Sequence, residues 1–157
     1  AKNDGLNFIH DNVGYNYRLS NVSAALGLAQ LEKLNYFIRK KRLIREYYKK
    51  LFKNIKGAEI FESPFYSKNN NWLNLLRIDE NIFGKKTKYL VKELNKNNLQ
   101  VRPVWHPNHM QKMYKKYYAY EIKNGPKMIK NLICLPSSAF LTKKNISKIV
   151  KSIKNLI

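Results

Sequence analysis

The sequence has one cysteine, six scattered glycines, ten acidic residues and no long apolar run. The lone Cys134 excludes an intramolecular disulfide, and its apolar neighbours indicate a buried thiol. The glycines do not form a glycine-rich phosphate loop of the nucleotide-binding kind. No apolar stretch approaches the roughly 18 residues of a membrane span, and the first residues lack a secretory leader pattern. We therefore expect a cytoplasmic protein with no membrane partner.

Positive charge dominates the sequence, with 31 lysines and arginines and a formal net charge of +21. A charge of this size raises nucleic acid as a partner. Only six of the basic residues are arginines, however, and the lysines are spread along the chain as on solvated helix faces. We therefore predict no nucleic-acid partner. The alternative is a basic nucleic-acid-binding module, whose binding would weaken steeply with salt.

Hydrophobic periodicity predicts a mixed α/β (α+β) fold. Ser20 has the residue type of a helix N-cap, and apolar residues at helical spacing follow it to about Phe52. Further helices are predicted over 85–95 and after the N-cap residue Thr142, with short helical pieces over 111–118 and 126–131. Strands are predicted over 58–61, 72–78, 99–105 and 132–135. This order predicts a long first helix and a short, largely antiparallel sheet with helices on one face.

A loop rich in hydrogen-bonding side chains precedes the first predicted helix. It reads Gly14-Tyr15-Asn16-Tyr17-Arg18, and Gly14 permits a sharp turn. Asn16 can donate amide N–H groups and Arg18 offers a planar guanidinium fork, and both groups suit phosphate oxygens. From these residues alone, two interpretations stay open. The loop either binds an anion, or it is a structural turn whose tyrosines pack and whose arginine pairs with a carboxylate.

A second group of such residues lies near the predicted strand 99–105. Arg102 and His109 can donate hydrogen bonds to phosphate or sugar oxygens, and Trp105 offers a flat apolar face. His106 and His109 have the spacing His-x-x-His, but no cysteine or carboxylate at a recognisable spacing completes a zinc site. We therefore predict no bound metal.

Residues 10–34 resemble the loop and long helix of the DegT/DnrJ/EryC1/StrS family of pyridoxal-phosphate-dependent sugar aminotransferases. In that family a Gly-x-Asn-Tyr-Arg loop precedes an Ala-Ala-x-Gly helix, as it does here. The pattern Pro-x-His-x-Gln at 107–111 and the pattern Leu-Pro-x-x-x-x-Leu-Thr at 135–142 are similar to later family motifs. The resemblance implies the C-terminal portion of a fold-type I enzyme. Residues 1–18 would be a loop entering from a missing large domain, and residues 19–157 would be the small domain.

The same resemblance implies a cofactor and a reaction. The cofactor would be pyridoxal 5'-phosphate, and its Schiff-base lysine would lie upstream, so that no catalytic residue is expected in this chain. The substrate would be a nucleotide-linked keto sugar, aminated with glutamate as donor, and the product would enter surface polysaccharide, lipopolysaccharide or glycan synthesis. The enzyme would be a homodimer with a shared active site.

The resemblance also implies roles for the two groups of residues. Asn16 and Arg18 would contact the phosphate of the cofactor in the neighbouring subunit. Substrate contacts would come from Tyr15, Tyr17, Arg102, Trp105 and His109. Two alternatives within the family stay open. The chain could be a catalytically inactive fragment, or it could belong to a sugar dehydratase, in which the cofactor lysine is replaced.

Overall fold

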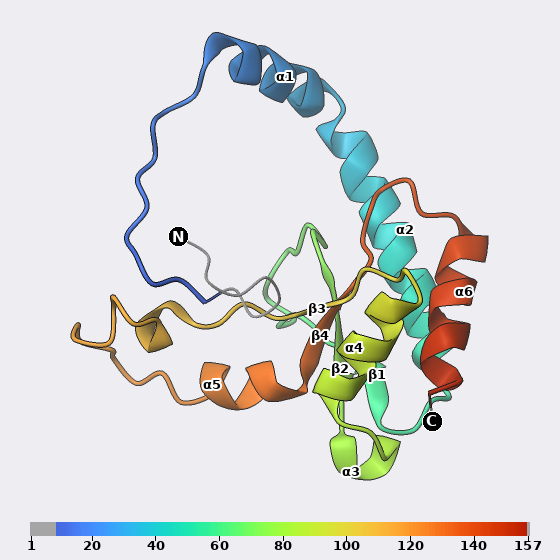
Figure 1. Ribbon diagram of the computed structural model, residues 1–157. Coiled ribbons are helices and arrows are strands. Elements are labelled where there is room, and N and C mark those ends of the chain that lie inside the picture. The colour runs from blue at the N-terminus through green and yellow to red at the C-terminus, as the bar shows by residue number, and fades with distance from the viewer. Residues whose placement is uncertain (1–8, 157) are drawn as a thin grey trace.

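The computed structural model describes residues 9–156, which form a layer of helices on one face of a small sheet (Figure 1). The first eight residues of the predicted loop 1–18, and Ile157, lie outside the described residues. The helices are α1 (Asn21–Glu32), α2 (Leu34–Phe52), α3 (Glu80–Phe83), α4 (Thr87–Lys96), α5 (Gly125–Met128) and α6 (Lys143–Lys154). The 3-10 turns are η1 (Asn108–Met110) and η2 (Ile129–Asn131). The strands are β1 (Ala58–Ile60), β2 (Asn74–Ile78), β3 (Arg102–Pro103) and β4 (Leu132–Leu135).

The strands form one antiparallel sheet in the order β1-β2-β4-β3, which confirms the predicted mixed fold class. In the central pair, Leu75 of β2 lies opposite Cys134 of β4, and Arg102 of β3 lies opposite Cys134 from the other side. Residues directly opposite one another point to the same face of a sheet. Leu76 and Ile133, one residue further along, therefore point to the opposite face, where the helices pack.

Helices α2, α4 and α6 cover that face and build the core with it (Figure 1). In α2 the buried residues Ile44, Tyr48 and Phe52 recur every four positions, which places them on one side of the helix. The fully buried side chains of the core include Tyr48, Leu76, Leu90, Leu94, Ile133 and Ile153. Burying one side chain of this size stabilises the fold by about 1.5–3 kcal/mol. This part of the chain therefore has a core of its own.

The first predicted helix begins where expected but consists of two helices. The Ser20 side chain accepts a hydrogen bond from the Ser23 backbone N–H at 3.3 Å, as an N-cap does. The helix breaks at Lys33, which separates α1 from α2 and whose own N–H turns back to the Gln30 carbonyl at 3.2 Å. No proline or glycine marks this break, so the sequence pattern runs through it without a signal.

Helix α1 has an unusual surface for the end of a domain. Its apolar residues are distributed around the whole helix, and none of its residues is buried. Val22, Leu26, Leu28 and Leu31 are each more than 60% exposed. Figure 1 shows α1 projecting from the domain at the far end of α2, away from the sheet. A helix that is apolar on all sides is ordinarily buried inside a protein. The surface of α1 is therefore built to be covered.

Two predicted elements differ from the structure, and one short helix was not predicted. The predicted strand 99–105 shortens to β3 because Leu99 instead donates to the Leu94 carbonyl at 3.0 Å, and because Pro103 has no N–H to pair. The helical piece predicted over 111–118 is wrong: this segment forms consecutive turns with exposed tyrosines, since it has no apolar face to bury. The single-turn helix α3 was too short to give a periodic signal, and the Asp79 side chain caps it.

Two local features fix the ends of the helical layer. Thr142 and Asn145 form a capping box at the start of α6, in which each side chain bonds to the backbone N–H of the other residue. Gly57, just before β1, has φ +74°, and a Cβ atom there would lie 2.6 Å from the backbone nitrogen of Phe83. Gly57 is therefore required both by the backbone conformation and by the close approach of α3.

Candidate functional site

The loop before α1 presents its polar and aromatic side chains to solvent. The Asn16 Oδ1 atom accepts a hydrogen bond from the Arg18 backbone N–H at 2.9 Å, and Arg18 has φ 80°, a conformation that costs energy for a residue with a side chain. Tyr15 and Tyr17 are 78% and 90% exposed. The alternative in which these tyrosines pack within their own domain is therefore not what the structure shows.

The donor set of this loop fits a phosphate group. Arg18 is exposed, and the ion pairs found within residues 9–156 do not involve it. The Asn16 amide keeps its N–H groups for another acceptor, since its oxygen is the atom that holds the turn. An arginine fork and an amide donor on a turn of fixed shape are suited to bind an anion from outside the domain.

The second predicted group lies along and after β3. Arg102 lies in β3 and is exposed. Trp105, two residues after the end of β3, is 42% exposed, and His109 is half-buried in η1. Trp105 stacks on Trp72, with ring centroids 5.6 Å apart and an angle of 17° between the planes. The residues around Trp105 indicated its candidate role in the sequence. The contact between Trp72 and Trp105 was not predictable, because it depends on the order of the strands in the sheet.

A buried glutamine joins the two sequence motifs. The Gln111 side chain accepts from the His10 backbone N–H at 3.2 Å and donates to the His106 carbonyl oxygen at 3.4 Å, and the residue is 5% exposed. The start of the first motif is thereby attached to the second one. Beyond this contact the segment that leads to α1 arches away from the sheet and from β3 (Figure 1), so the two predicted groups of residues lie on separate parts of the chain.

One lysine and the cysteine have environments that differ from those of the exposed residues. The Lys41 ammonium donates to the carbonyl oxygens of Trp72 at 2.9 Å and Ser137 at 2.6 Å, and burial lowers the pKa of this lysine. These contacts fix α2 to the start of β2 and the end of β4. Burial raises the pKa of the Cys134 thiol to about 11, so the thiol stays protonated and unreactive at neutral pH.

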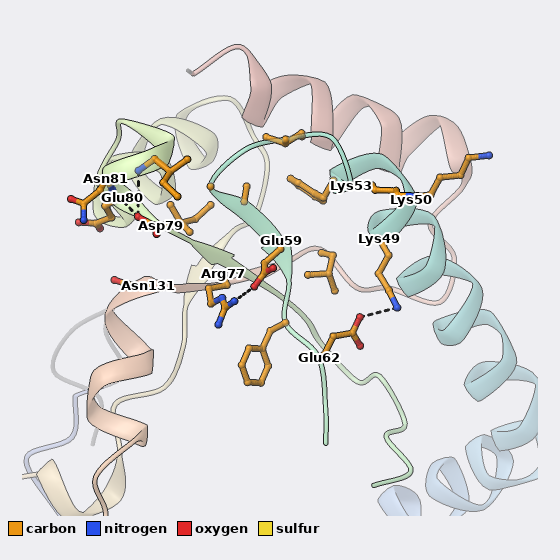
Figure 2. Close-up of a pocket in the computed structure, with 18 of the residues that line it drawn as sticks. Lys49, Lys50, Lys53, Glu59, Glu62, Arg77, Asp79, Glu80, Asn81 and Asn131 are labelled. Atoms are coloured by element: carbon orange, nitrogen blue, oxygen red, sulfur yellow. Dashed lines mark hydrogen bonds and ion pairs between the residues drawn. The ribbon is translucent and has the colours of Figure 1, made fainter. Parts of the chain in front are cut away.

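A broad open groove of about 1410 Å³ lies beside β1 and the end of α2 (Figure 2). Figure 2 shows two ion pairs in this groove: Lys49 lies 2.8 Å from the Glu62 carboxylate, and Arg77 pairs with Glu59, while Lys50 and Lys53 extend from the end of α2 without an ion pair among the residues drawn. Arg45, which is buried, also pairs with Glu62. None of the predicted site residues lines this groove. The ion pairs that Glu59 forms with β2 and Glu62 forms with α2 hold this part of the fold together.

Residues 9–156 contain neither a group of three or more metal-ligating side chains that could hold an ion nor a helix long and apolar enough to cross a membrane. The described part of the chain thus offers two exposed surfaces with recognition chemistry. One is the arginine and amide loop before α1, and the other is the segment with Arg102 and the stacked tryptophans.

Several solved structures have a similar fold. DesI, solved in the presence of its TDP-sugar product, matches with a TM-score of 0.78 and 17% identity over 87% of this chain and 35% of DesI. The E. coli GDP-4-keto-6-deoxy-D-mannose-3-dehydratase with bound hydrated PLP matches with a TM-score of 0.72 and 23% identity over 89% of this chain and 36% of that enzyme. The fold is therefore that of the small domain of the pyridoxal-phosphate-dependent sugar aminotransferases and their relatives.

The chain belongs to the DegT/DnrJ/EryC1/StrS aminotransferase family, whose model matches residues 1–154. EpsN of Bacillus subtilis (strain 168), named provisionally as a pyridoxal phosphate-dependent aminotransferase, is 29% identical over 99% of this chain and 40% of its own length. The GDP-perosamine synthase of Vibrio cholerae is 30% identical over 96% of this chain and 41% of its own length. The chain thus spans about two fifths of the curated relatives it matches and corresponds to their C-terminal portion. Homologues in the family bind pyridoxal phosphate.

Proposed function

We propose that this chain is the C-terminal part of a pyridoxal-phosphate-dependent aminotransferase that converts a nucleotide-linked keto sugar to an amino sugar. The observation that carries the proposal is the family match over residues 1–154, at about two fifths of the length of the relatives. The names of those relatives include GDP-perosamine synthase and dTDP-4-amino-4,6-dideoxy-D-glucose transaminase. We take glutamate as the amino donor and surface polysaccharide or glycan synthesis as the pathway.

The exposed helix α1 supports the proposal on physical grounds. Val22, Leu26, Leu28 and Leu31 leave a large apolar surface in water, which a stable domain does not ordinarily do. A larger domain that precedes this chain would cover that surface. In this arrangement residues 1–18 are the loop that enters from the large domain, and residues 19–157 are the small domain.

In the proposed enzyme the loop before α1 contributes to the active site of a neighbouring subunit. The cofactor supplies the electron sink for the exchange of the keto group for an amine, and its lysine comes from the large domain. Arg18 and Asn16 bind and orient the cofactor phosphate of the partner subunit through charge-assisted hydrogen bonds. Tyr15 and Tyr17 line the substrate side of the same loop. On the small domain itself, Arg102, Trp105 and His109 bind the nucleotide-linked sugar.

A sugar dehydratase is the second candidate function. The fold match to the E. coli GDP-4-keto-6-deoxy-D-mannose-3-dehydratase, solved with bound hydrated PLP, supports it as an alternative, because that enzyme shares this fold with the matched aminotransferases. The two functions differ in the large domain, where the aminotransferase has a lysine for the cofactor and the dehydratase has another residue. An inactive fragment would lack the large domain altogether.

The first experiment is to determine the coding sequence upstream of Ala1 and to express the complete protein. An uninterrupted frame with a cofactor lysine is expected, and the purified protein is expected to convert glutamate to 2-oxoglutarate in the presence of a nucleotide-linked 4-keto-6-deoxyhexose. Loss of water from the sugar without consumption of glutamate would identify the dehydratase. A stop codon immediately upstream would identify the fragment.

A mixed dimer tests whether the active site is shared. The Arg18→Gln variant and a variant without the cofactor lysine are each expected to be inactive. In a shared site, a dimer of one variant with the other regains one intact site out of two. Random pairing of equal amounts therefore restores about a quarter of the wild-type rate, since about half of the dimers are mixed. Arg39→Gln, an exposed charge change on α2, is the matched control and keeps full activity. No recovery in the mixture would refute the shared site.

A further inference from the structure

The two tryptophans of the chain lie against each other on the surface, although 33 positions separate them in the sequence. Trp72 precedes β2 and Trp105 follows β3, and these two strands flank β4 in the sheet. Their rings are nearly parallel, with an angle of 17° between the planes, and the residues are 62% and 42% exposed. The pair therefore presents large, flat aromatic faces to solvent.

The backbone at Trp72 and at the start of β2 is held by hydrogen bonds. The Trp72 carbonyl oxygen accepts from the Lys41 ammonium at 2.9 Å, and the Trp72 N–H donates to the Asn70 side chain at 2.9 Å. Two residues later the buried Asn74 donates to the Ser137 hydroxyl from its backbone at 2.8 Å and from its side chain at 3.0 Å. Trp72 is thus attached to α2 and to the end of β4, so its ring is presented from a fixed position.

A cationic side chain lies in the same segment as Trp105. Arg102 is exposed on the face of the sheet that α2, α4 and α6 do not cover, three positions before Trp105 and opposite Cys134. The segment therefore combines two stacked aromatic rings with a planar arginine fork. Aromatic rings bind the flat face of a nucleobase, and an arginine fork binds phosphate oxygens.

We propose that Trp72, together with Trp105, forms the stacking platform for the nucleobase of the substrate, and that Arg102 binds its diphosphate. The ligand class is a nucleoside diphosphate, as the activated end of a nucleotide-linked sugar. The identity of this ligand rests on the proposed function, whereas the platform itself rests on the geometry of the two rings. Lys41 is the residue that positions Trp72. Base stacking on an aromatic residue tolerates different bases, so the platform accepts purine and pyrimidine nucleotides.

The test uses the chain itself and the emission of its two tryptophans, both of which are in the platform. The chain is titrated with GDP, dTDP, UDP and, as a base-free probe, inorganic pyrophosphate, at a fixed ionic strength. The nucleotides are expected to quench the emission. Equilibrium dialysis then gives the affinities of the variants, because a change at Trp72 also removes one of the two fluorophores.

Matched variants separate the base from the diphosphate. Trp72→Leu is expected to weaken nucleotide binding by about tenfold or more, which is the usual loss for one base–aromatic stack. Trp72→Phe keeps a ring and is expected to retain most of the affinity. Neither change is expected to alter pyrophosphate binding, which Arg102→Gln weakens. Tyr118→Leu, at a residue that is 88% exposed in the turn segment, is the control for loss of a surface aromatic ring and leaves all affinities unchanged.

Three outcomes would overturn the inference: no quenching by any nucleotide at millimolar concentration, equal effects of Trp72→Leu and Tyr118→Leu, or equal effects of Trp72→Leu on nucleotides and pyrophosphate. Any of these outcomes would favour the alternative that the two rings are covered by the remainder of the protein and bind no nucleotide. The complete protein distinguishes this inference from the proposed function. If the platform is correct, Trp72→Leu raises KM for the nucleotide-linked sugar and leaves kcat nearly unchanged. Nucleotide binding that depends on Trp72 in a complete protein that transfers no amine would retain the platform and refute the proposed function.

Discussion

Replacing apolar residues of α1 tests whether this helix belongs to the core of its own domain. Leu26 and Leu28 are 65% and 62% exposed, whereas Leu90 in α4 is fully buried. Leu90→Ala removes a buried side chain and leaves a cavity, which lowers the free energy of unfolding by about 2–5 kcal/mol. Leu26→Ala and Leu28→Ala remove side chains that already contact water. Each is expected to change the free energy of unfolding by less than about 0.5 kcal/mol.

Urea unfolding of the 157-residue chain measures the three variants under the same conditions. With a urea dependence of about 1–3 kcal/mol per molar, Leu90→Ala is expected to lower the midpoint by about 1 M or more. The α1 variants are expected to unfold at the wild-type midpoint. A large decrease for Leu26→Ala or Leu28→Ala would mean that α1 packs within this domain, and the argument for a covering large domain would fail.

The complete protein should respond in the opposite way. If the large domain covers Val22, Leu26, Leu28 and Leu31, each side chain contributes about 1.5–3 kcal/mol on burial, or about 6–12 kcal/mol for the four. Leu26→Ala and Leu28→Ala are then expected to destabilise the complete protein by amounts similar to the Leu90→Ala effect. Unchanged stability of the complete protein would show that α1 stays in water there as well.

Three further predictions concern the domain itself. Thr142→Ala removes the cap of α6 and is expected to lower the free energy of unfolding by about 1 kcal/mol in thermal unfolding, whereas Thr142→Ser keeps it. Gly57→Ala is expected to cost more than about 1 kcal/mol because of its positive φ and the close approach of α3, while Gly14→Ala, with open space around it, costs little. The hydrogen bond from Lys49 lowers the pKa of Glu62, so this carboxylate stabilises the fold above its unfolded pKa of 4.5 and loses the effect as pH falls through its lower folded value. Glu62→Gln, at a half-exposed group, is therefore expected to cost about 0.2–1 kcal/mol at pH 7 and nothing in strong acid, as urea unfolding against pH can measure.

The sequence predicted elements whose signals are local. Ser20 and Thr142 have the residue types of N-caps and cap α1 and α6, and the buried run 132–135 forms the central strand β4. The break at Lys33 was not predictable, because no residue there disfavours a helix on its own. The shortening of β3 was not predictable either, since it depends on Leu99 donating to the end of α4 in place of a neighbouring strand.

The candidate site shows the same limit at longer range. Arg102, Trp105 and His109 could be selected from the sequence because their segment resembles a family motif and because they offer donors and a flat ring. Their partner Trp72 could not, because its contact with Trp105 requires β4 to lie between β2 and β3. The roles of Asn16 and Arg18 stay predictions, since the group they are proposed to bind belongs to another subunit.

If the loop before α1 reaches a partner subunit as proposed, the hydrogen bond between His10 and Gln111 affects how readily the subunits associate. This hydrogen bond fixes one end of the segment that leads to α1, and the packing of α2 on the sheet fixes the other end. The chain between His10 and α2 is therefore attached to the domain at both ends. A segment attached at both ends has far fewer accessible conformations than a free terminus of equal length. The conformational entropy that this segment loses when a partner binds it is correspondingly smaller. Loss of the His10–Gln111 attachment would therefore slow association, even though every residue that contacts the partner is still present.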